Sequence, residues 1–181
     1  MMKIVKWLAW LAVGLLLIAS FLGLVGCEKK YSFNSIDVTG VNWGKNIELP
    51  GLNGNVFQAK DFDKKVTAIF FGFLSCPDAC PNTLVQMVRL KKALGKRAKD
   101  LQVIFVSVDP NRDTSKRVKE FLHSFDKDFK GSIIPEEKLD EIKKEFKLVV
   151  QRVSQEKTGN DMNEFYLIDH TTHTYIYDKE G

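Results

Sequence analysis

A nearly continuous apolar segment, residues 66–73, leads into a pair of cysteines, Cys76 and Cys80. Its β-branched and aromatic residues are typical of a strand that is buried on both faces, as in the middle of a parallel sheet. Apolar side chains then recur at helical spacing up to Gly95, which predicts a helix over residues 77–94. The segment therefore predicts a buried strand that delivers two thiols to the start of a helix.

Strand and helix patterns alternate along the rest of the chain. Apolar segments predict further strands at residues 101–108, 132–134, 148–153, 165–168 and 174–177. Helices are predicted to begin near Asp113 and Pro135, where an N-capping pair and a proline precede amphipathic segments. A turn rich in glycine and asparagine, residues 51–55, predicts an N-terminal β-hairpin. This order predicts an α/β domain with a mostly parallel central sheet flanked by helices.

Polar residues that follow two of the predicted strands are the first candidates for a site. Cys76 comes shortly after the strand at residues 66–73, and Asp109 comes directly after the strand at residues 101–108. Ligands and catalytic groups of open α/β sheets lie beyond the carboxyl ends of the strands. Cys76 and Asp109 are therefore expected at the same edge of the sheet.

The N-terminus has the features of an export signal. Two lysines precede an apolar run over residues 7–25, and the run closes on Leu-Val-Gly directly before Cys27. This pattern predicts a lipoprotein signal peptide over residues 1–26, with lipidation at Cys27. The alternative is an uncleaved transmembrane anchor, because the run is close to the length that spans a bilayer and the lysines would stay in the cytoplasm.

Either arrangement predicts the same division of the chain. We expect an export segment, a polar membrane tether and one folded domain at residues 1–26, 27–41 and 42–181. The domain would face the periplasm or the extracellular side of the cell membrane. The formal net charge is only +4, and no basic stripe with interleaved aromatic residues is present, so nucleic-acid binding has no support.

The chemistry of the cysteine pair depends on its spacing and its position. Lipidation of Cys27 would leave Cys76 and Cys80 as a pair, which outside the cytoplasm can cycle between dithiol and disulfide. On a helix, side chains at i and i+4 share one face, with room for an ion between two sulfurs. The positive helix N-terminus favours thiolates, which nucleophilic attack and metal binding both require. The pair is therefore predicted to exchange disulfides or to bind a soft metal.

Two thiolates alone leave a metal site incomplete, and a histidine would complete it. Soft sulfur ligands together with an imidazole suit Cu(I). The chain has three histidines. His123 lies within a predicted helix, whereas His170 and His173 follow the strand predicted at residues 165–168. Spacing alone does not separate His170 from His173 as the third ligand.

Three segments in the same order resemble the Sco/SenC family of membrane-tethered, thioredoxin-like copper proteins. They read FFGFLSCPDACPNTL, VIFVSVDPNRDT and FYLIDHTTHTYIYDKEG, and the resemblance extends over residues 42–181. It implies a thioredoxin-like fold and a site for one copper ion that is formed by Cys76, Cys80 and His170. The resemblance thus selects His170 over His173.

Charged residues accompany these ligands in the matching segments. Asp109, Arg112 and Asp113 belong to the Val-Asp-Pro and Arg-Asp-Thr parts of the second segment, and Asp169 directly precedes His170. We expect Asp109 and Asp169 to support the ligands from outside the coordination sphere, or to hold the loops near them. A helix cap formed by Asp113 and Thr114 is also a sufficient structural explanation for this pair.

The resemblance further implies a role without substrate turnover. It indicates delivery of copper to the CuA centre of cytochrome c oxidase subunit II during assembly, or reduction of the cysteines of that centre. Subunit II or another copper chaperone would be the partner. The alternative is an extracytoplasmic thiol-disulfide oxidoreductase in which Cys76 attacks and Cys80 resolves. A peroxiredoxin-like peroxidase fits the cysteine spacing less well.

The sequence departs from related folds in two places. Family members continue past the turn at residues 178–181 with a strand and a helix, so both elements are expected to be missing here. The strand at residues 174–177 would then lie at an exposed edge. Thioredoxins carry a cis-proline that faces their cysteines, whereas this chain has no proline after Pro135. That absence favours a histidine facing the cysteines.

Overall fold

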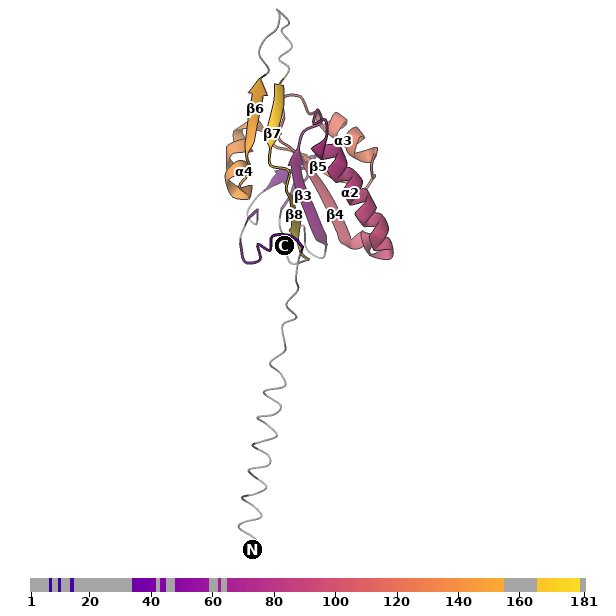
Figure 1. Cartoon of the computed structure of the whole chain (residues 1–181), viewed down its shortest axis with the longest axis vertical. Helices are drawn as coiled ribbons and strands as arrows, with labels where there is room; N and C mark the ends of the chain where they lie inside the picture. Colours follow the sequence, from indigo (N-terminus) through magenta and orange to yellow (C-terminus); the bar gives the residue numbers. More distant parts are fainter. Residues whose placement is uncertain are drawn as a thin grey trace, which may run out of the picture. The chain divides into compact units, whose positions relative to one another are not determined.

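The structure, a computed structural model, describes residues 34–41, 43–44, 48–58, 62, 65–154 and 166–179, together with residues 7, 10 and 14. Apart from these last three positions, the predicted signal peptide and its lipidation site at Cys27 lie outside the described residues. The chain forms two compact units, Met1–Val41 and Asn42–Gly181, and the strands among the described residues belong to the second (Figure 1). In the described part of the chain, no helix has the length and apolar character needed to cross a membrane.

The centre of the second unit is a four-stranded sheet with the strand order β5-β4-β3-β8. Its strands are β3 (Val66–Gly72), β4 (Leu101–Ser107), β5 (Lys130–Ile133) and β8 (Thr174–Tyr177). β3, β4 and β5 are parallel, whereas β8 runs antiparallel to β3. The predicted mostly parallel sheet is therefore confirmed, and the strand that leads to the cysteines is an inner strand.

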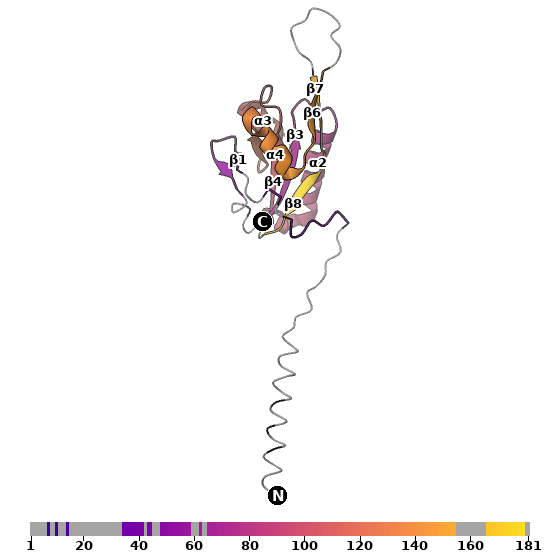
Figure 2. The same ribbon diagram turned by 90° about the vertical axis from the view of Figure 1, so that its left-hand side faces the viewer.

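Helices cover both faces of this sheet (Figures 1 and 2). α2 (Ala79–Leu94) and α3 (Ser115–His123) pack on one face, and α4 (Leu139–Phe146) packs on the other. Short 3-10 helices, η2 (Gly95–Asp100) and η3 (Glu136–Lys138), follow α2 and precede α4. The helices predicted near Asp113 and Pro135 are thus present.

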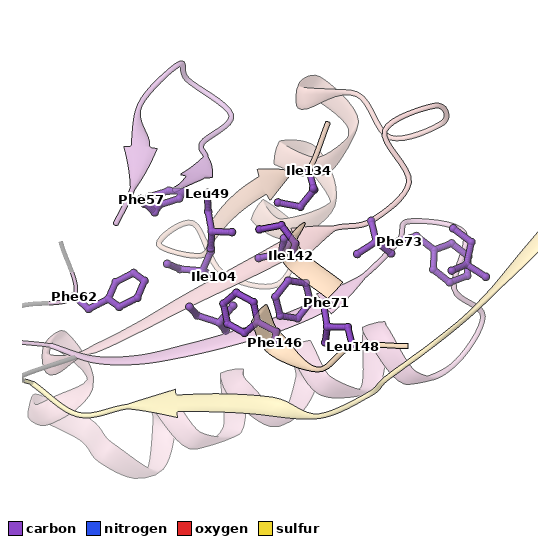
Figure 3. Packing of buried hydrophobic residues seen from close by; sticks show 14 of the residues in the cluster. Leu49, Phe57, Phe62, Phe71, Phe73, Ile104, Ile134, Ile142, Phe146 and Leu148 are labelled. Atoms are coloured by element: carbon purple, nitrogen blue, oxygen red, sulfur yellow. The ribbon is translucent and has the colours of Figure 1, made fainter. Parts of the chain in front are cut away.

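Two-sided burial explains why β3 is apolar along its whole length. Successive side chains of a strand point to opposite faces of the sheet. Phe70 packs in the core beneath α2 and α3, whereas Ile69 and Phe71 pack in the core beneath α4. Figure 3 shows this second core, in which the rings of Phe71 and Phe146 meet edge to face with centroids 4.8 Å apart.

Two further antiparallel ladders flank the central sheet. β1 (Leu49–Pro50) pairs with β2 (Val56–Phe57) and forms the predicted N-terminal hairpin. β6 (Val150–Ser154) pairs with β7 (Tyr166–His170), and Val150 lies opposite His170. The sequence predicted a strand that ends at residue 168, before His170. The strand continues to His170 because its pairing with β6 continues to that residue.

Candidate metal centre

The first cysteine lies in the turn between β3 and α2. The Cys76 N–H donates to the Phe73 carbonyl oxygen at 3.2 Å, and α2 begins only at Ala79. The helix begins two residues later than its predicted start at residue 77, so Cys76 lies in the turn before it and does not share a helix face with Cys80. The following residue is Pro77, and a proline disfavours the helical conformation for the residue before it. Cys76 is half-buried in this turn.

The second cysteine lies in the first turn of α2 and is directed at the backbone of β3. Cys80 is only 2% exposed. A Cβ atom on Gly72 would overlap the Cys80 Sγ and would lie 2.9 Å from Cε2 of Phe105. Only glycine leaves room for the sulfur at this point of the strand. Sequence reasoning missed Gly72, although a glycine inside an otherwise apolar strand is a signal for such a close approach.

Burial determines the protonation state of this thiol. Removal from water raises the pKa of Cys80 to about 12, and a backbone hydrogen bond from Phe73 opposes the rise only in part. Without a metal, Cys80 is therefore a neutral thiol at neutral pH. It must release its proton before its sulfur can act as a thiolate ligand.

His170, the last residue of β7, completes the group. Its Nε2 lies 3.8 Å from the Cys80 Sγ, and its Nδ1 lies 3.0 Å from the Thr171 carbonyl oxygen. A carbonyl only accepts hydrogen bonds, so Nδ1 carries the proton and Nε2 presents its lone pair to the sulfur. The Phe73 ring stands nearly perpendicular to the imidazole, at 84° and 5.7 Å between centroids, and limits its rotation.

The three side chains form a group that can hold a metal ion. The sulfurs of Cys76 and Cys80 and a ring nitrogen of His170 all lie within 4.8 Å of one another. Three ligand atoms about 2.3 Å from one ion in a trigonal arrangement lie about 4.0 Å from one another. The ligand atoms would therefore have to approach one another by less than about 1 Å for all three to bind one ion.

Asp109 lies at the same edge of the sheet, as predicted, but its contacts lead away from the three ligand candidates. Its carboxylate is fully buried and pairs with the Arg112 guanidinium at 2.5 Å. The Tyr166 hydroxyl donates to the other carboxylate oxygen at 2.6 Å. Asp109 thus holds the start of β7, the strand that ends at His170. Sequence reasoning missed Tyr166, which carried no signal for this role.

The remaining candidates lie outside this group. Asp169 is exposed, on the opposite side of β7 from His170, as the alternation of strand side chains requires. His173 is exposed after the end of β7, and His123 is exposed on α3. Asp113 does not cap α3, because the Thr114 hydroxyl accepts the hydrogen bond from the Arg117 N–H.

The sequence of this chain is similar to a known protein family and to several of its members. The family model described as SCO1/SenC matches residues 40–181. The SCO2-like protein of Rickettsia conorii is 34% identical over 141 residues, which make up 78% of this chain and 67% of the relative. The mitochondrial protein SCO1 of Saccharomyces cerevisiae is 31% identical over 139 residues, which make up 76% of this chain and 46% of the relative. The chain thus spans between about half and two thirds of the length of these relatives.

A solved structure shares the fold. The structure of Bradyrhizobium japonicum ScoI with copper bound matches with a TM-score of 0.66 and 32% sequence identity. The match covers 77% of this chain and 85% of the ScoI chain.

Proposed function

Because the chain belongs to the SCO1/SenC family, we propose that it holds one copper ion through Cys76, Cys80 and His170. The proposal rests on one observation: two thiol sulfurs and one imidazole nitrogen all lie within 4.8 Å of one another. Two sulfur ligands and a ring nitrogen suit Cu(I). The similar ScoI protein is described with copper bound, which supports copper as the ion.

Each ligand has a distinct part in binding. Cys76, in the half-buried turn, is the sulfur that an incoming ion can reach first. Cys80 lies deeper and exchanges its proton for the ion, since the thiolate is the binding form. His170 presents Nε2 while its Nδ1–H is held by the Thr171 carbonyl oxygen. Copper binding therefore requires the reduced pair and releases protons.

Copper would be cargo for the protein rather than a catalytic cofactor. Family membership supports a role in assembly of cytochrome c oxidase, and the acceptor we propose is the CuA centre of subunit II. The ion would come from, or pass to, another copper chaperone or the oxidase subunit itself. A half-buried Cys76 beside a buried Cys80 allows ligand exchange from one open side.

The test is copper binding by the full chain in detergent. The reduced protein is expected to bind one Cu(I), measured by competition with a chromophoric chelator. Cys76→Ser and Cys80→Ser should each lower the affinity by at least about 100-fold, because each removes a thiolate ligand. Cys27→Ser makes the same chemical change outside the group and should leave the affinity unchanged. Equal affinity of the Cys80→Ser variant and the unsubstituted chain would disprove the site.

The same cysteines support a second candidate activity, the reduction of a partner disulfide. Cys76 is the more accessible sulfur, and the neutral Cys80 thiol is poorly reactive until it loses its proton. Cys76 would attack one sulfur of the partner disulfide, and Cys80 would then displace the partner thiolate and close an internal disulfide. A mixed disulfide that accumulates with the Cys80→Ser variant and oxidised subunit II is the expected evidence. Without such a species, copper delivery alone is supported.

The proposed membrane attachment rests on the N-terminal sequence. We expect cleavage after residue 26, a lipid on Cys27, a tether to residue 41 and a domain over residues 42–181 that faces the periplasm or the extracellular side. Mass spectrometry of the mature N-terminal peptide distinguishes the two anchors. A lipidated Cys27 supports the lipoprotein, whereas a retained residue 1 supports the transmembrane anchor.

A further inference from the structure

The loop between β4 and α3 contacts both parts of the chain that contribute to the candidate metal centre. Three residues of this loop, Asp109, Arg112 and Asp113, make these contacts, and we call them the bracket. Asp109 and Asp113 are buried, at 0% and 2% exposed, although they carry carboxyl groups. Burying a carboxylate is costly, and apolar residues fill a core at lower cost. The bracket therefore needs an explanation beyond packing.

On the histidine side, the bracket holds Tyr166 by its ring, its hydroxyl and its backbone. The Arg112 guanidinium lies 3.7 Å from the centre of the Tyr166 ring and donates to the Tyr166 carbonyl oxygen at 2.8 Å. Asp109 accepts from the Tyr166 hydroxyl. Contacts to three parts of one residue define both the position and the tilt of the strand. His170 is the other end of the same five-residue strand, about 13 Å away along β7.

On the cysteine side, the bracket holds the turn that carries Cys76. One carboxyl oxygen of Asp113 accepts from the Leu74 N–H at 3.0 Å and from the Ser107 hydroxyl at 2.6 Å. Leu74 lies two residues before Cys76, and Ser107 is the last residue of β4. The turn is thereby attached to the rigid end of a central strand.

Phe73 connects the two sides. Its ring lies 5.8 Å from the Arg112 guanidinium and packs perpendicular to the His170 imidazole. Its carbonyl oxygen accepts the hydrogen bond from the Cys76 N–H. Arg112 therefore contacts Phe73, which in turn contacts both the Cys76 turn and the His170 imidazole.

We propose that the bracket sets the distance between the two halves of the metal centre, with Asp109 and Arg112 positioning His170 and Asp113 positioning the cysteine turn. This inference rests on the proposed function, since it treats His170 as a ligand. None of the three residues binds the ion. They act through β7 and the turn at Leu74, and they keep three ligand atoms from distant parts of the chain close enough to share one ion.

A double-mutant cycle separates positioning from general stabilisation. In the full reduced chain, Tyr166→Phe removes only the hydroxyl that donates to Asp109. Arg112→Lys removes the planar guanidinium group but keeps the positive charge. Each is expected to weaken Cu(I) binding by about 10-fold, a typical effect of groups that orient a ligand. In a His170→Ala background Tyr166→Phe should have no effect, because β7 then contributes no ligand, whereas Arg112→Lys should keep a smaller effect through its contact with Phe73. Asp113→Asn should weaken binding in both backgrounds, because it acts on the cysteine turn.

Tyr175→Phe is the matched control. The Tyr175 hydroxyl also makes one hydrogen bond of 2.6 Å, a partly buried one to the Phe146 carbonyl oxygen, but it does not touch the bracket. The control variant should lose stability without losing copper affinity. Equal losses of affinity for Tyr166→Phe with and without His170, or no loss at all, would overturn the inference.

A second readout does not depend on copper. In the metal-free protein, Tyr166→Phe is expected to shift the NMR signals of the His170 imidazole, whereas Tyr175→Phe should leave them in place. Unchanged imidazole signals in Tyr166→Phe would also overturn the inference. Failure of the unsubstituted chain to bind Cu(I), with shifted imidazole signals in Tyr166→Phe, would instead contradict the proposed function and leave the bracket supported.

Discussion

The His170 Nε2 lies 3.8 Å from the Cys80 Sγ, although 90 residues separate the two in the chain. One comes from a strand paired with β6 and the other from the first turn of α2. The central sheet, on which both elements are anchored, brings them together.

Replacement of His170 tests the third ligand directly. His170→Ala is expected to weaken Cu(I) binding by at least about 10-fold, since even groups that only orient a ligand have effects of that size. Competition with a chelator measures the change. His173→Ala is the matched control, because His173 is exposed three residues further on and should leave the affinity unchanged. The reverse order of the two effects would assign the ligand to His173.

Asp169 is expected to contribute little despite its position next to His170. Its side chain is exposed and lies on the other side of β7. Asp169→Asn should therefore change the Cu(I) affinity by less than about 2-fold, as is usual for exposed sites without strong contacts. The same chelator competition applies. A loss as large as that of His170→Ala would show that Asp169 orients the imidazole.

Gly72→Ala tests the close approach of Cys80 to β3. The added methyl group would overlap the Cys80 Sγ and lie 2.9 Å from Phe105, so the variant should lose about 1–3 kcal/mol of unfolding free energy. Urea denaturation of the metal-free protein measures this loss. In a Cys80→Ala background the sulfur is gone, and the loss should be smaller. An equal loss in both backgrounds would show that Phe105, and not Cys80, limits the space.

The buried thiol predicts a stability that falls at alkaline pH. Burial raises the pKa of Cys80 from 9.0 to about 12, so between these values the unfolded chain loses a proton that the folded chain keeps. The contribution is fully present below pH 9 and is lost as the pH rises toward 12. The free energy of unfolding should fall by roughly 1 kcal/mol per pH unit in this window.

Two half-buried tyrosines add to this loss above pH 10, since partial burial also raises the pKa of Tyr175 and Tyr177. Denaturation of the reduced, metal-free protein between pH 8 and 10 isolates the cysteine. Cys80→Ala should show a clearly shallower decline there than the unsubstituted chain. Parallel curves would contradict a strongly raised pKa for Cys80.

Local patterns predicted much of the fold because their physical causes are local. The continuous apolar run of β3 reflects burial on two faces, and Thr114, one of the two capping candidates, caps α3. The errors lie at element ends. α2 begins at Ala79, after its N-cap Asp78, and not at residue 77, and β7 extends to His170 because β6 pairs with it. Pairing with a distant partner leaves no trace in the spacing of a single strand.

By itself, the sequence determined that a buried strand ends at two thiols, Cys76 and Cys80, because hydrophobic periodicity and proline act on neighbouring residues. Its residue spacing left His170 and His173 equivalent, and only the resemblance to a family separated them. The tertiary structure decided which imidazole lies beside the sulfurs. That choice depends on the pairing of β7 with β6 and on the contacts of Asp109 and Arg112 with Tyr166. Such contacts join residues more than fifty positions apart, and they exist only once the sheet has brought those segments together.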